Sequence, residues 1–180
     1  SQTAVKSFFS DYYCTSEAWS VKTSAHRVIA ATNSWLHGQT RRGKHADDRD
    51  RGYVCTFSAL VIKSTTAHVF HVGDARVSLV SGASIEHLTQ EHRLVISSRE
   101  SYLSRALGVS QQIEVDYIAR SIKIGDIFVL ATDGVHEHVD NRFLLAAIGG
   151  HAADLDAAAK AIVAEASRRG STDNLTVQVI

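Results

Sequence analysis

Asp74, Asp133 and Asp173 each lie where an apolar segment meets a polar or glycine-bearing turn. Each one alone is explained by turn chemistry, because an aspartate caps its own backbone and a neighbouring glycine accepts positive φ. Together they predict carboxylates that project from one end of a sheet. Clustered carboxylates repel one another unless a cation neutralises them. Oxygen ligands without a cysteine partner favour Mg²⁺ or Mn²⁺ over zinc. Two such ions ~4 Å apart are a recurrent device for phosphoester hydrolysis.

The composition predicts one soluble globular domain: 180 residues, 44% hydrophobic and 21% charged. Nineteen Lys and Arg balance nineteen Asp and Glu, which disfavours a nucleic-acid binder and an acidic tail. No apolar run approaches the ~20 residues of a membrane span, and no signal segment opens the chain. Two cysteines, Cys14 and Cys55, are too few for a disulfide scaffold. A reducing cytoplasm is therefore expected.

The N-terminal third has helical spacing. Apolar residues recur on one stripe over 3–14 and 17–38, with Ser16 as the expected N-cap and Gly38 as the expected C-cap. The charged run 39–52 is interpreted as a solvated connection rather than a docking loop, because such runs usually lie at the surface.

The pattern then changes to β-branched and aromatic segments bounded by turns, which predicts strands. The connections between successive strands are mostly hairpins. We therefore predict an α+β fold with antiparallel sheets and helices outside, and the alternative is a doubly wound parallel sheet. Segments apolar on both faces predict burial on both sides. The predicted strands are 53–62, 66–72, 76–80, 85–89, 113–122, 126–131 and 175–180, and the predicted helices are 100–107 (closed by Gly108), 142–148 and 152–168.

Six motifs follow one another in an order that resembles the protein phosphatase 2C family, the metal-dependent Ser/Thr protein phosphatases, and its bacterial branch in particular. The resemblance runs over the whole chain, from about Ser1 to Ile180. The motifs are GDAR at 73–76, LTQEH at 88–92, LSRALG at 103–108, GD at 125–126, TDGV at 132–135 and STDNLTV at 171–177.

Membership implies a four-layer αββα sandwich of two antiparallel sheets, with a metal centre at one end. The resemblance makes Asp133 and Asp173 ligands of a core dinuclear centre and Asp74 the ligand of a third ion, so two or three Mn²⁺ or Mg²⁺ ions are expected. It also gives supporting roles to four residues: Gly134, Asn174, Gly73 and Arg76.

The sequence departs mildly from the family pattern at Ala75, Glu91 and Thr132, where Ser, Asp and Ser are common. A larger departure lies upstream, because the family's bridging aspartate, its glycine and a phosphate-binding arginine have no counterpart here. The chain contains no Met and opens at Ser1, in what resembles the helix after the bridging turn. We therefore expect residues 1–180 to be a single partial domain that lacks its N-terminal strands and is inactive alone.

Several polar residues have structural interpretations beside functional ones. His136 and His138, which flank Glu137 near Asp133, are interpreted as surface or helix-start histidines rather than metal ligands, because the family site is rich in oxygen. His71 is expected to be a core histidine bonded to backbone. Arg105, like Arg76, is expected to pair with a carboxylate or carbonyl rather than with phosphate.

The resemblance implies a Mg²⁺- or Mn²⁺-dependent phosphatase that hydrolyses phosphoserine and phosphothreonine with a metal-activated water. No Cys or Ser lies in a nucleophile setting, so no catalytic side chain is assigned. The implied partners are phosphorylated proteins and a cognate or fused Ser/Thr kinase in signal transduction, with no nucleic acid and no membrane. The alternative is a catalytically silent, phosphatase-like module that docks a kinase or signalling partner.

Overall fold

The computed structural model describes residues 1–42, 52–97 and 100–180, and part of the charged run 39–52 lies outside these ranges. The chain divides into two compact units. Unit 1 consists of Ser1–Gly73 and His92–Ser121, and unit 2 consists of Asp74–Glu91 and Ile122–Ile180. The chain passes from one unit to the other between residues 73 and 74, 91 and 92, and 121 and 122.

Two helices open unit 1, α1 (Gln2–Tyr12) and α2 (Val21–Arg42). The caps predicted for the second helix are wrong. Ser20, not Ser16, accepts a hydrogen bond from the N–H of Thr23 at 3.1 Å, which starts the helix four residues later than expected. Gly38 lies inside the helix rather than at its end, because it does not take the left-handed backbone of a glycine C-cap.

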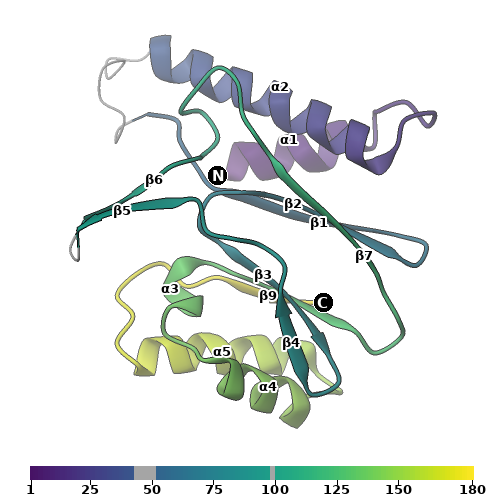
Figure 1. Cartoon of the computed structure of the whole chain (residues 1–180), viewed down its shortest axis with the longest axis vertical. Helices are drawn as coiled ribbons and strands as arrows, with labels where there is room; N and C mark the ends of the chain where they lie inside the picture. The colour runs from purple at the N-terminus through teal and green to yellow at the C-terminus, as the bar shows by residue number, and fades with distance from the viewer. Residues whose placement is uncertain (43–51, 98–99) are drawn as a thin grey trace. The chain divides into compact units, whose positions relative to one another are not determined.

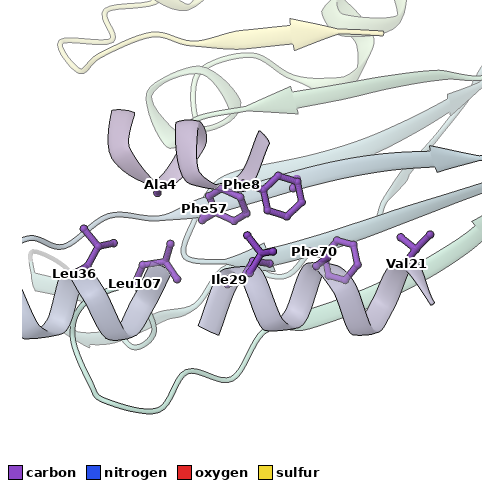
Figure 2. Close-up of a cluster of buried hydrophobic side chains, with 11 residues drawn as sticks. Ala4, Phe8, Val21, Ile29, Leu36, Phe57, Phe70 and Leu107 are labelled. Atoms are coloured by element: carbon purple, nitrogen blue, oxygen red, sulfur yellow. The ribbon is translucent and has the colours of Figure 1, made fainter. Parts of the chain in front are cut away.

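The helices of unit 1 pack on an antiparallel sheet of order β1-β2-β7, formed by β1 (Phe57–Lys63), β2 (Thr66–Val72) and β7 (Asp116–Ser121). Ala59, Phe70 and Tyr117 are cross-strand partners in one row. Phe8 of α1 and Ile29 of α2 join Phe70 in a buried cluster between the helices and the sheet (Figure 2). The aromatic rings make this core, because each buries a large apolar area.

Burial on both faces, predicted for the apolar strands, is confirmed for β2, where the neighbours Val69 and Phe70 are both 0% exposed. Neighbouring residues of a strand point to opposite faces, so β2 is covered on each side.

Unit 2 contains an antiparallel sheet of order β4-β3-β8-β9 with helices packed on it (Figure 1). Asp140 and Asp154 each accept the N–H three residues ahead, from Phe143 and Ala157, and so cap the two longer helices. The elements of this unit are β3 (Arg76–Ser81), β4 (Ser84–His87), β8 (Ile127–Ala131), α3 (Asp133–His136), α4 (Asn141–Gly150), α5 (Leu155–Arg168) and β9 (Val177–Val179).

The helix predicted over 100–107 is wrong. The segment forms β6 (Glu100–Leu103), which pairs antiparallel with β5 (Arg93–Ser97). Hairpin pairing overrides the helical pattern here, since intrinsic propensity is a weak prior. Gly108 therefore closes no helix and lies in a turn, at φ +85°, where a Cβ would lie 2.1 Å from the Tyr53 carbonyl oxygen.

Apart from this segment, the predicted α+β class with antiparallel sheets and packed helices is confirmed, and the parallel alternative is wrong.

Candidate metal site

Strand register brings the three aspartates to one end of the sheet in unit 2. Ala131, at the end of β8, pairs with Arg76 at the start of β3 and with Val177 at the start of β9. Asp74 lies two residues before Arg76, and Asp133 lies two residues after Ala131. Asp173 lies four residues before Val177. Because both pairings are antiparallel, all three aspartates leave the sheet at the same end.

Asp133 and Asp173 are brought together by close approach of backbone. Asp133 is the first residue of α3, and its carboxylate accepts the N–H of Gly134 at 2.9 Å. A Cβ on Gly134 would lie 3.0 Å from the Asp173 Cβ and 3.0 Å from the Asn174 carbonyl oxygen. Only glycine therefore lets the start of α3 approach this loop without a shift, and the supporting role predicted for Gly134 has this physical basis.

The loop that carries Asp173 is tied to the end of β8. Thr132 donates its N–H to the Thr176 carbonyl at 3.0 Å, and its hydroxyl accepts the Thr176 N–H at 3.1 Å. The Asp173 carboxylate accepts the backbone N–H of Asn174 at 2.6 Å. Asn174 thus contacts Asp173 through its backbone, and the aspartate is an exposed group on an anchored loop.

Asp74 is buried, with 9% exposed, and its backbone carbonyl accepts a hydrogen bond from Nε2 of His136 at 2.9 Å. Because His136 is the last residue of α3 and Asp133 is the first, one short helix contacts Asp74 and carries Asp133. His136 is buried, so the prediction of a surface histidine is wrong for this residue.

Arg76 and Arg105 pair with carboxylates, as predicted. The Arg76 guanidinium donates to Glu91 at 2.6 Å in unit 2. In unit 1, Arg105 donates to Asp116 at 2.8 Å. Both guanidinium groups form ion pairs with carboxylates, so their contacts do not indicate that they bind phosphate.

Unit 1 contains a polar cluster that was not predicted from the sequence. His92 contacts Asp116 through Nε2 at 2.9 Å, while Gly73 donates its N–H to His92 Nδ1 at 3.0 Å. Burial favours a raised pKa for Asp116, but hydrogen bonds from His92 and Arg105 outweigh it and lower the pKa below its ordinary value. The sequence signal was the LTQEH motif at 88–92, whose partners lie far away in the chain.

The donor chemistry at this end of the sheet fits a hard dication, because carboxylate oxygens are what Mg²⁺ and Mn²⁺ prefer. The set is incomplete, however. Over residues 1–42, 52–97 and 100–180, no three His, Cys, Asp or Glu side chains are grouped so that they could hold a metal ion. Asp74, Asp133 and Asp173 therefore supply ligands of the right kind without forming a closed site by themselves.

Comparison with known proteins identifies the family of this chain. Residues 1–170 match the model described as Protein phosphatase 2C, so this chain belongs to the protein phosphatase 2C family. Protein phosphatase PhpP of Streptococcus pneumoniae is 24% identical over 151 residues, which are 74% of this chain and 60% of PhpP. The serine/threonine phosphatase stp of Listeria welshimeri is 26% identical over 187 residues, covering 92% of this chain and 73% of stp.

A solved structure has the same fold. The catalytic domain of the serine/threonine protein phosphatase PstP, solved in complex with two manganese ions, matches with a TM-score of 0.81 at 18% identity, covering 99% of this chain and 77% of that one. The predicted membership of the bacterial branch is confirmed by these relatives. Among the residues that the structure describes, no helix has the length and apolar character of a membrane span.

Proposed function

We propose that the complete gene product has the protein serine/threonine phosphatase activity of its family, that this activity depends on Mn²⁺ or Mg²⁺, and that this chain carries part of the metal site. The observation that carries the proposal is the placement of Asp74, Asp133 and Asp173 at one end of the unit 2 sheet. Phosphoserine and phosphothreonine of proteins are the proposed substrates, and a cognate or fused kinase is the proposed partner. A cytoplasmic location is part of the proposal, supported by two free cysteines, of which Cys14 is exposed.

The proposed roles follow the geometry of each aspartate. Asp133 and Asp173, held together across Gly134, are proposed to be ligands of a core dinuclear centre. Asp74, held by His136 through its carbonyl, is proposed to be the ligand of a third ion. The ions would supply an activated water and offset negative charge on the phosphoryl oxygens. The chain's own residues anchor the carboxylates and fix their spacing.

The complete gene product, assayed with p-nitrophenyl phosphate and a phosphothreonine peptide, tests this proposal. We expect turnover that requires Mn²⁺ or Mg²⁺ and is lost with EDTA. Asp133→Asn should reduce it at least ~100-fold, since loss of even an outer-shell partner costs ~10- to 100-fold. Asp156→Asn, which changes an exposed carboxylate in the first turn of α5, is the matched control and should retain full turnover. Metal-independent turnover, or an active Asp133→Asn variant, would refute the proposal.

A second candidate is the silent, phosphatase-like binding module. The observation in its favour is that the described residues do not form a group of three metal ligands. A dication held by one or two carboxylates keeps most of its waters and binds weakly, so residues 1–180 alone should turn over phosphoester at background rate. The two candidates separate in the complete gene product, where the module would bind phosphoprotein and remain without Mn²⁺-dependent turnover.

A further inference from the structure

Three imidazoles hold the backbone of the Gly73–Asp74 step. In unit 1, Gly73 donates its N–H to His92 Nδ1 at 3.0 Å, and its carbonyl accepts from His71 Nε2 at 3.0 Å and from the His92 N–H at 2.8 Å. In unit 2, the carbonyl of Asp74 accepts from His136 Nε2 at 2.9 Å. All three histidines are buried.

The hydrogen bonds fix the tautomer of each imidazole. A carbonyl oxygen only accepts, so Nε2 of His71 and Nε2 of His136 carry protons. The N–H of Gly73 only donates, so Nδ1 of His92 is unprotonated, and its Nε2–H is the donor to Asp116 at 2.9 Å. The geometry therefore requires a proton on Nε2 at all three positions.

The Gly73–Asp74 step is held through its backbone, because residue 73 has no room for a side chain. Gly73 has φ +118°, and a Cβ there would lie 2.3 Å from Thr56 Cγ2, so residue 73 can carry no side chain that helps to orient Asp74. The positive φ belongs to the left-handed region that favours glycine. Surrounding side chains can instead orient this step through hydrogen bonds to the backbone N–H and C=O groups of residues 73 and 74.

We infer that His136 is a positioning residue for Asp74, acting within unit 2 through the hydrogen bond to the Asp74 backbone carbonyl. The inference rests on the proposed function, because it takes Asp74 to be a metal ligand. His136 contacts Asp74 itself and lies on the four-residue helix that begins with Asp133. It thus couples the positions of two proposed ligands. Its Nδ1 lies 3.7 Å from Glu91, beyond hydrogen-bonding distance, so the Nε2–H bond is the polar contact that holds the ring.

The test uses the complete gene product with three substitutions. His136→Leu removes the donor and keeps a buried apolar side chain. His136→Gln keeps an N–H donor near the place of Nε2. His138→Leu is the control, because His138 lies two residues further on and also has a buried Nδ1. Mn²⁺ affinity is measured by the electron paramagnetic resonance of free Mn²⁺, beside thermal unfolding without metal.

We expect His136→Leu to weaken the Mn²⁺ affinity of the protein by ~10- to 100-fold, because loss of a residue that orients a metal ligand typically has an effect of this size. His136→Gln should recover most of this loss, and His138→Leu should leave the affinity unchanged. Wild-type Mn²⁺ affinity in His136→Leu would overturn the positioning role while leaving the proposed function intact. Absence of Mn²⁺ binding by the wild-type protein would overturn both. Long-range ¹H–¹⁵N spectra should show the Nε2–H tautomer of His136, and an Nδ1–H tautomer would overturn the inference whatever the metal does.

Discussion

Unit 1 and unit 2 each consist of helices packed on an antiparallel sheet, but they differ in their buried clusters and in their polar groups. Unit 1 has an aromatic core, in which Phe8, Phe57 and Phe70 lie between helices and sheet (Figure 2). The main buried cluster of unit 2 is aliphatic, with Val129, Ile162 and other small or branched side chains, and Phe128 is the large aromatic side chain buried in this unit. All three aspartates belong to unit 2, whereas the His92–Asp116–Arg105 cluster belongs to unit 1. The difference teaches that the two units fix their polar groups in different ways, by strand register in unit 2 and by side-chain hydrogen bonds between distant segments in unit 1.

The largest expected effect is on the core of unit 1. Phe70→Ala removes a side chain that is 0% exposed, and we expect it to lower the free energy of unfolding by ~3–5 kcal/mol. Both tryptophans, Trp19 and Trp35, lie in unit 1, so urea unfolding followed by tryptophan fluorescence reports on this unit. Ile62→Ala, at a residue 49% exposed, is the control and should change little. A loss below ~1 kcal/mol for Phe70→Ala would contradict this packing.

Ile162→Ala makes the corresponding change in unit 2, at another side chain that is 0% exposed. The expected loss is ~2–5 kcal/mol. Far-UV circular dichroism reports on both units, whereas fluorescence reports on unit 1. Since each unit has a buried cluster of its own, the dichroism midpoint should fall further than the fluorescence midpoint. Equal shifts of both midpoints would show that the two cores unfold as one.

Features fixed by residues close together in the sequence could be predicted. Features fixed by contacts between residues far apart in the sequence could not. The hairpin at Ser81–Ser84 was predictable because Gly82, at φ +60°, fixes a local turn. The three aspartates were predictable because each adjoins an apolar segment. The histidine cluster was not, since His92 meets Gly73 and Asp116 at separations of 19 and 24 residues. The β5–β6 hairpin was missed because pairing, not propensity, decides it, and the charged run over 43–51 lies outside the described residues.

A smaller effect is expected at the contact between Asp133 and Asp173. Gly134→Ala places a Cβ 3.0 Å from Asp173 Cβ and from the Asn174 oxygen, so it should cost ~1–3 kcal/mol of stability and weaken Mn²⁺ binding. Gly149→Ala, in α4, is the matched control, because nothing lies within 4 Å of its Cβ position. The control should be neutral or stabilising by ~0.5–1 kcal/mol. Equal behaviour of the two variants in thermal melts would refute the close approach.

The smallest expected effect concerns Glu165 in unit 2. Hydrogen bonds from Arg168 and then Arg169 lower the pKa of its carboxyl from 4.5 to about 2. A depressed folded-state pKa stabilises the fold above the unfolded-state value, and this contribution is lost as the pH falls from about 4.5 towards about 2. Glu165→Gln should therefore lower the melting temperature at pH 7, and its difference from the wild type should shrink below pH 4.5. The exposed Glu17→Gln is the control, and a difference constant with pH would contradict the assigned pairing.

The central claim is that Asp74, Asp133 and Asp173 share one metal-binding end of the unit 2 sheet. Substoichiometric Mn²⁺ added to ¹⁵N-labelled protein tests it most directly, because paramagnetic broadening detects even weakly bound ions near each amide. We predict selective loss of the amide signals around residues 74, 133–134 and 173–174, and recovery of all three regions together in Asp133→Asn. Broadening confined to one of the three regions, or centred on other acidic residues such as Asp154 and Asp156, would contradict the account.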